Sequence, residues 1–380
     1  MKVGKKMRRF LAFLGIFLVV LTIGYLEPVF FPAEKPQHVA EDSGRQNVSH
    51  TALPYEEIKT SGYAEYVGKP ASKFIEKFGE PVEKQASGMS YEVWTYGEKD
   101  SDYLELNIQD DNISMIKAFN DSKELSPFSI GMNLSDISER MTIYSDFAFT
   151  YNEMNYNIEL TEEDMNYRPL IAFDNQTFAI LFFNQGKSEL AAVVYLAKEA
   201  LLTLMPYQLI EGEARPLLPK DQLAGFDPVK SNQMVRVINM LRSDEGLPTY
   251  HVNTENQKNA QKLFELLSKQ QKNIFSMERL ENWQFSKEQL SATEMFTLSN
   301  DEYQKLLKLG QLDKKNATGM YTEPIYDPTF TVLSWFSDSL YHSRFAHEGN
   351  ENIGVAFSKA SVLVLIQETE KEISQTEDSE

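Results

Sequence analysis

Few residues in this sequence have the types and spacing that catalysis or metal binding requires. The chain of 380 residues contains no cysteine and five histidines, which excludes thiolate chemistry and leaves few ligands for a histidine-rich metal site. Ser339 and His342 stand out, because they follow the helical pattern of Val332, Trp335 and Phe336. His342 would be a general base only with a nearby acid. The sequence has no Ser-His-Asp or His-Glu-x-x-His phrase, so a nucleophile is not identified.

Composition and charge narrow the class of protein. Hydrophobic residues make up 42% of the chain and charged residues 24%, which is typical of globular proteins and excludes collagen-like, mostly disordered and multi-span membrane proteins. The length predicts two or three domains. The net charge of -19 repels phosphate backbones, so we expect no nucleic-acid partner.

Residues 63–207 show the pattern of one helix followed by several antiparallel strands, twice. The two predicted helices carry Phe74, Ile75 and Phe78, and Leu134, Ile137 and Met141, both at helical spacing. The predicted strands are 91–96, 103–108 and 113–119 in the first copy, then 156–160, 169–173, 178–183 and 190–196 in the second. The sequence therefore predicts a duplicated α+β domain. We expect its aromatic residues, including Trp94, Tyr96, Phe173, Phe182 and Phe183, to pack in a core rather than form a carbohydrate platform.

The remaining chain begins with helices and ends with a hairpin. Helical spacing recurs at 234–241 and 260–267, and two apolar runs at 353–357 and 362–366 predict a closing β-hairpin. Polar or proline-containing stretches at 32–62 and 208–230 are predicted linkers, and 368–380 is an acidic tail. We expect 63–207 and 231–367 to fold as separate domains.

The second of these regions resembles the CAP superfamily of cysteine-rich secretory, antigen 5 and pathogenesis-related proteins. The resemblance rests on Asn239, Arg242 and the phrase Gly246-Leu247-Pro248, then on Ser339 with His342, then on Ile353-Gly354-Val355. Residues 63–207 resemble the CAP-associated N-terminal domain that precedes this module in membrane-anchored proteins of Gram-positive bacteria. The resemblance implies that 231–367 forms an α-β-α sandwich with a broad surface cleft.

The same resemblance implies a degenerate metal site. In many members two histidines and two acidic residues in the cleft hold a divalent metal, and His342 matches the second histidine. Met277 and Met320 stand where the family places a histidine and a glutamate, and methionine sulfur is a poor ligand for zinc, calcium or magnesium. We therefore expect no metal and no cofactor, with Ser339, His342, Met277, Met320 and Glu323 lining the cleft. A shifted alignment, in which Glu323, Glu294 or His347 fills a vacated place, is the alternative.

The amino terminus has the features of a membrane-directed segment. Five lysines and arginines between positions 2 and 9 precede an uncharged apolar run over 10–26, and further apolar residues extend it to 31. The sequence predicts a signal anchor over 1–31, with a cleaved signal peptide as the alternative. The basic cluster would stay in the cytoplasm and place the rest of the chain outside.

These expectations favour a single-pass protein of the cell membrane with a non-enzymatic, binding or scaffolding CAP domain outside the cell. Its partners would be the membrane, through 10–31, and an unknown extracellular protein, cell-wall or lipid ligand. The alternative function is a cell-envelope hydrolase, acting on peptide or cell-wall material, that uses the cleft around His342.

Overall fold

The computed structural model describes residues 54–215, 226–289, 291, 295–312, 316–346 and 351–368. All of these residues belong to one unit of the chain, which begins at Ala52. The predicted anchor over 1–31, most of the predicted linker over 32–62 and nearly all of the predicted acidic tail lie outside the described residues.

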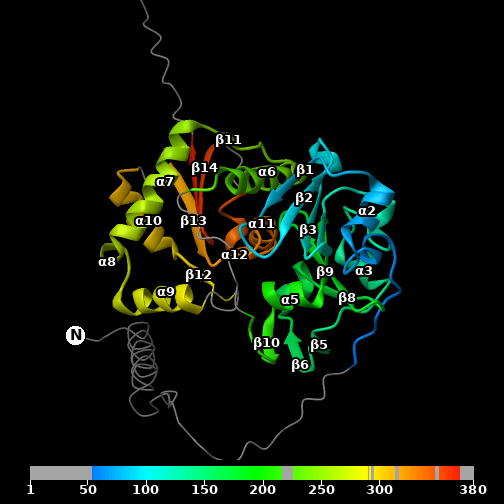
Figure 1. The fold of residues 1–380 in the computed structure, drawn as a ribbon. Helices are drawn as coiled ribbons and strands as arrows, with labels where there is room; N and C mark the ends of the chain where they lie inside the picture. The colour runs from blue at the N-terminus through cyan, green and yellow to red at the C-terminus, as the bar shows by residue number, and fades with distance from the viewer. Residues whose placement is uncertain are drawn as a thin grey trace, which may run out of the picture. The chain divides into compact units, whose positions relative to one another are not determined.

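A seven-stranded antiparallel sheet forms the centre of the first region (Figure 1). Its spatial order is β1-β2-β3-β4-β9-β8-β7, so β1 to β4 from the first copy of the repeat join the second copy through the β4–β9 pair. The strands are β1 (Glu83–Ala86), β2 (Glu92–Tyr96), β3 (Leu104–Gln109), β4 (Asn112–Ala118), β7 (Leu170–Ala172), β8 (Thr177–Phe183) and β9 (Leu190–Ala197).

Short helices precede each copy of the repeat. The first copy opens with α2 (Ala71–Phe78) and the second with α3 (Leu134–Ser138), which has a capping box between Asn133 and Asp136. The predicted duplication of a helix followed by antiparallel strands is confirmed. The sequence analysis missed the later helices α4 (Glu162–Tyr167) and α5 (Lys198–Leu204), as well as three short 3-10 turns at Gly62–Glu65, Asp100–Asp102 and Lys123–Leu125.

A second sheet corrects the predicted boundaries of the linker over 208–230. Its order is β10-β6-β5, formed by β5 (Asp146–Tyr151), β6 (Met154–Glu159) and β10 (Gln208–Glu211). Residues 208–211 are therefore an edge strand rather than linker, which the short polar sequence Gln208-Leu209-Ile210-Glu211 did not reveal. The following helix already begins at Pro228, because Asp227 caps it and proline suits the first helical position.

The second region is an α-β-α sandwich, as the resemblance implied. Its sheet has the order β11-β14-β15-β13-β12, and only the β11–β14 pair is parallel. Its strands are β11 (His251–Val252), β12 (Phe296–Thr297), β13 (Ala317–Glu323), β14 (Glu351–Ser358) and β15 (Ser361–Glu368). Its helices are α6 (Pro228–Asp244), α7 (Thr254–Lys269), α8 (Gln271–Ile274), α9 (Met277–Gln289), α10 (Asn300–Gly310), α11 (Pro328–Phe336) and α12 (Ser339–His342).

The two regions share a core, which corrects the expectation of separately folded domains. One buried cluster combines Phe178 and Val194 of the seven-stranded sheet with Ile238 of α6, Leu333 of α11 and Val355 of β14. Helices α6 and α11 therefore lie between the two large sheets (Figure 1). The physical reason is that β8 and β9 are apolar on both faces, and a sheet of this kind must be covered on both sides.

The opposite faces of both sheets have cores of their own. Phe74 and Ile137, from α2 and α3, pack with Leu181 on the far face of the seven-stranded sheet. Leu263 of α7 and Leu306 of α10 pack on the far face of the second sheet. The aromatic residues of the strands, among them Trp94, Tyr96, Phe173, Phe182 and Phe183, are buried, so they form core rather than an exposed platform.

Candidate functional site

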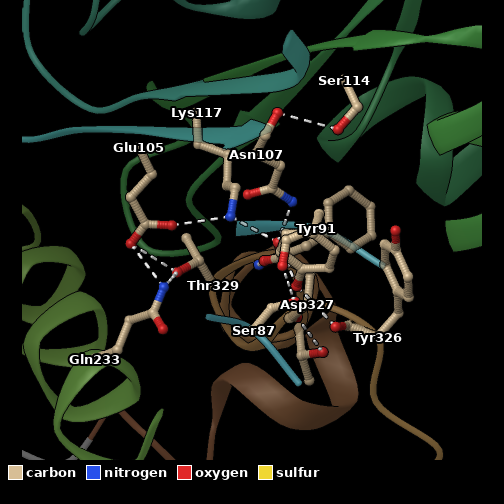
Figure 2. Close-up of polar contacts among 12 residues, drawn as sticks. Ser87, Tyr91, Glu105, Asn107, Ser114, Lys117, Gln233, Tyr326, Asp327 and Thr329 are labelled. Carbon is tan, nitrogen blue, oxygen red and sulfur yellow. Dashed lines mark hydrogen bonds and ion pairs between the residues drawn. The ribbon is translucent and has the colours of Figure 1, made fainter. Parts of the chain in front are cut away.

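A closed polar cluster joins the two regions where α11 begins (Figure 2). The ammonium of Lys117, on β4, lies between two carboxylates: Nζ is 2.7 Å from Asp327 Oδ2 and 2.9 Å from Glu105 Oε2. Asp327 also caps α11, since its Oδ1 accepts a hydrogen bond from the Phe330 N–H at 2.8 Å. All three charged side chains are completely buried.

Neutral donors from both regions complete the cluster (Figure 2). Asn107 donates to Asp327 Oδ2 at 2.8 Å, and the Tyr91 hydroxyl donates to the same oxygen at 3.3 Å. Gln233 and Thr329 donate to Glu105 Oε1 at 3.1 and 2.9 Å, and the Tyr103 hydroxyl also donates to that oxygen. Such complete pairing is what buried charges require.

The mutual charges decide the ionisation of the cluster. Burial alone would lower the pKa of Lys117, but the charges of Asp327 and Glu105 together raise the pKa above its usual value. Burial would likewise raise the pKa of Asp327, yet Lys117 and Asn107 lower it. Lys117 and Asp327 are therefore both charged at neutral pH. Because their polar atoms are engaged with each other, this cluster fastens the two regions together rather than presenting a free reactive group.

A groove of about 640 Å³ opens beside the cluster, with Asp327 in its wall. The first region contributes the segment from Leu204 to Leu209, where Met205 ends α5 in a left-handed conformation with φ of 34° and Pro206 follows. The second region contributes residues from Pro324 to Tyr341. Five aromatic side chains line the groove, namely Tyr207, Tyr326, Phe330, Trp335 and Tyr341, together with a few polar ones, among them Arg168, Gln208, Ser334 and Asp338.

The predicted residues Ser339 and His342 lie on α12, at the end of the groove marked by Asp338 and Tyr341. His342 Nε2 is 2.8 and 3.0 Å from the two carboxylate oxygens of Glu245. The backbone N–H of Ser339 donates to Glu163 of α4 at 3.0 Å. Among the described residues, no serine or threonine hydroxyl hydrogen-bonds to His342, so the histidine–carboxylate pair has no nucleophile beside it.

The other predicted cleft residues are not brought together with His342. Met277 begins α9 and is 80% exposed, whereas Met320, on β13, is 0% exposed and belongs to the shared core. Glu323, also on β13, is 4% exposed; its Oε2 accepts from the Ser361 hydroxyl at 2.6 Å, and its Oε1 is 3.8 Å from Lys287 Nζ. Side chains three positions apart on a strand point to opposite faces, so Met320 and Glu323 cannot share a site.

The first region covers the element that carries His342. Gln185, in the turn between β8 and β9, donates to the Ser337 carbonyl at 2.8 Å, and Asn184 donates to Asp244 at 2.8 Å. The neighbouring Gly186 lies so close to Glu245 that a Cβ there would be 3.4 Å from its carboxyl carbon. Contacts with the first region therefore hold the histidine–carboxylate pair in place.

Sequence reasoning missed Glu245, the partner of His342, although a signal existed. Asp244 and Glu245 stand at the C-terminal end of α6, where the helix dipole disfavours negative charge. An acidic pair at such a position needs a compensating contact, which Asn184 and His342 provide. By contrast, no local pattern marks the aromatic residues of the groove, because the two regions must pack together before the groove exists.

The described part of the chain contains no group of three or more histidine, aspartate or glutamate side chains placed to hold a metal ion. His342 and Glu245 would supply two ligands, fewer than the three or four protein ligands that zinc sites use. The alternative ligands His347 and Glu294 lie outside the described residues, and Glu323 is bound to Ser361 instead.

The fold of the described residues is similar to the folds of solved SCP-domain and cysteine-rich secretory proteins. Residues 67–207 match the sequence family described as CAP-associated N-terminal. A crystal structure of a cysteine-rich secretory protein from Staphylococcus aureus superposes with a TM-score of 0.63 at 18% identity, covering 83% of this chain and 95% of that one. An extracellular protein containing an SCP domain from Bacillus anthracis gives a TM-score of 0.61 at 17% identity, covering 89% and 100%.

A membrane protein is similar in sequence. The uncharacterized membrane protein YlbC of Bacillus subtilis is 22% identical over 217 residues, which are 56% of this chain. The alignment spans 62% of that protein, less than two thirds of its length. Within the described ranges, no helix has the length and apolar character needed to cross a bilayer; the predicted anchor lies outside those ranges.

Proposed function

We propose that the protein is a membrane-tethered, extracellular binding module whose ligand site is the groove between its two regions. The groove itself is the observation that carries this proposal. It is an unfilled volume of about 640 Å³, lined mainly by aromatic and aliphatic side chains with a few polar groups among them. Protein sites that bind small molecules have this composition.

The arrangement around His342 supports binding over catalysis. The histidine is paired with Glu245 and packed beneath the β8–β9 turn, and the hydrolase alternative would need a nucleophile or a bound metal within reach of it. The cluster around Lys117 is equally unsuited to catalysis, because its charged groups are fully buried and paired.

The extracellular, tethered location is the other half of the proposal. The sequence supports it through the basic residues and apolar run at 1–31, and the relatives are described as secretory, extracellular or membrane proteins. Protease treatment of intact cells tests it: the described region should be digested while a fragment containing the amino terminus stays in the membrane. Recovery of a shortened chain in the medium would indicate a cleaved signal instead.

Filling the groove tests the binding site. Ser334 lies in the groove wall and is partly exposed, so Ser334→Trp should occupy the volume. We expect water-soluble aromatic amide fragments to give saturation-transfer NMR signals with the full chain in nanodiscs and to lose them with Ser334→Trp. Ser135→Trp, on the exposed surface of α3, is the matched control and should behave like the unmodified chain. Equal signals from all three proteins would refute the groove as a binding site.

A further inference from the structure

β10 borders the groove. It pairs with β6 along one side and is the last strand of its sheet, so its other edge has no strand partner among the described residues. Gln208 and Leu209, consecutive residues of this strand, both line the groove. The backbone groups at such an edge can pair with another strand.

The groove continues into a second hollow, which makes the whole surface elongated. The second hollow has a volume of about 260 Å³ and lies between α9 and β12. Met295 lines both hollows, so they adjoin. Met295 is 51% exposed and Phe285, in the second hollow, is 49% exposed. Exposed apolar side chains along an elongated track are typical of a surface that binds a chain-like ligand.

Negative charge gathers at the α12 end of the groove. Asp338 lines it, and its carboxylate accepts hydrogen bonds from the N–H groups of Leu340 and Tyr341. Glu163 reaches the same place through the Ser339 N–H. The nearby cationic side chains Arg168 and His342 are paired with other carboxylates, those of Asp164 and Glu245, and the chain as a whole carries a net charge of -19. A positively charged ligand complements this end.

We propose that the ligand is an extended polypeptide segment, with apolar side chains and at least one lysine or arginine, that adds as a strand to the edge of β10. Backbone hydrogen bonds to β10 supply affinity, as in other cases of strand addition. Apolar side chains of the segment enter the aromatic groove and extend past Met295, and the basic side chain lies near Asp338 and Glu163. This inference rests on the proposed function, because it uses the same groove.

Two synthetic decapeptides provide the probe. In the first, valine, leucine and tyrosine alternate with threonine and lysine; the second has the same side chains, but alternate backbone nitrogens are methylated so that strand pairing is blocked. We expect the first peptide to bind the full chain saturably in fluorescence anisotropy and the second to bind at least about tenfold more weakly, because it forfeits several backbone hydrogen bonds. Equal affinities would refute strand addition.

Charge variants locate the basic side chain. The double variant Asp338→Asn, Glu163→Gln removes both charges, yet asparagine still caps α12 and glutamine still accepts from Ser339. We expect the lysine peptide to bind about tenfold more weakly to it, the loss of two exposed charge pairs. Glu76→Gln with Glu80→Gln is the control and should leave affinity unchanged, because Glu76 on α2 and Glu80 just after that helix are both exposed. An unchanged affinity in the double variant would refute the proposed position of the basic residue.

The outcomes separate this inference from the proposed function. If fragments bind the groove but no peptide does, the polypeptide inference falls and the binding function stands. If oleate or phosphatidylglycerol vesicles compete for the groove while peptides do not, the ligand is a lipid and the inference is again wrong. If neither fragments nor peptides bind, both proposals fail.

Discussion

The boundary between the two regions has a closed part and an open part, and Asp327 belongs to both. In the closed part its carboxylate is fully buried against Lys117, and neutral donors satisfy what the ion pairs leave. In the open part the same residue lies in the wall of a groove lined by aromatic side chains. The closed part fixes how the regions dock, and the open part is what that docking leaves available.

The difference shows which groups carry structure and which are free for a ligand. Burying three charges costs desolvation energy that the pairing mainly offsets, so such a cluster contributes specificity of docking more than net stability. The aromatic groove, in contrast, leaves apolar surface unburied, which folding alone does not favour. The first region therefore contributes one wall of the groove through Tyr207 and β10, and the polar cluster sets the position of that wall.

Removing Lys117, the cation at the centre of the closed part, should cause the largest loss of stability. Lys117→Met leaves Glu105 and Asp327 buried without a counter-charge, so we expect a loss of about 3–5 kcal/mol in the free energy of unfolding. Lys73→Met is the matched control, because Lys73 forms an exposed pair with Glu76 and should cost less than about 1 kcal/mol. Urea unfolding of the full chain measures both. Similar small losses in the two variants would contradict a tightly paired cluster.

Two buried carboxylates of the second region have pKa values that folding shifts in opposite directions. Glu302 is held by Arg279 at 2.9 Å and by the Ser299 N–H at 2.8 Å; burial opposes these contacts, but together they lower its pKa. Burial raises the pKa of Glu323, and the opposing effects of Lys287, 3.8 Å from its Oε1, and of the Ser361 hydroxyl do not offset this rise. The ionised form is therefore stabilised by folding at Glu302 and destabilised at Glu323.

The two pKa shifts predict opposite dependences of stability on pH. A carboxylate whose pKa is lowered by folding stabilises the protein at pH values above its unfolded pKa, which is about 4.3. That stabilisation is lost as the pH falls through the folded pKa. A raised pKa lowers stability as pH rises from the unfolded to the folded value. At pH 7 we expect Glu302→Gln to destabilise the full chain and Glu323→Gln to stabilise it, each by about 1 kcal/mol. The thermal midpoint of unfolding should therefore fall in the first variant and rise in the second. The gain from Glu323→Gln should vanish at pH 4, and shifts of equal sign at pH 7 would refute the assignment.

The sequence predicts more of the fold than of the candidate site. Helical and alternating periodicity located α2, α6, α7, α11 and most strands, because one buried face leaves a regular pattern. Periodicity alone does not identify what covers the face of β3 that carries Glu105 and Asn107: alternating polar residues are typical of a solvent-facing side, yet the second region covers them. No local pattern encodes a contact 210 residues apart, such as Lys117 with Asp327.

The predicted cleft residues illustrate the same limit. Ser339 and His342 follow the predicted helix of Val332, Trp335 and Phe336, although they form a separate short helix, α12. Met277, Met320 and Glu323 were positioned only by the order of the family's phrases. Met320 points into the core and Met277 into solvent, since strand direction and helix packing, not phrase order, decide where a side chain points.

A variant of His342 tests whether any reactive chemistry remains at the α12 end of the groove. His342→Ala removes the hydrogen bond to the buried carboxylate of Glu245, so we expect about 1–2 kcal/mol of lost stability. His251→Ala, on the exposed strand β11, is the matched control and should change little. Calorimetric titration of the full chain with zinc should reveal no tight stoichiometric site, and peptide and glycan substrates should not be hydrolysed. The reasons are that two neighbouring ligands are too few to hold the ion and that, within the described ranges, no serine or threonine hydroxyl hydrogen-bonds to the histidine. A tight zinc site that disappears in His342→Ala and persists in His251→Ala would overturn the degenerate-site interpretation, because residues outside the described ranges would then have to complete the coordination around His342 and Glu245.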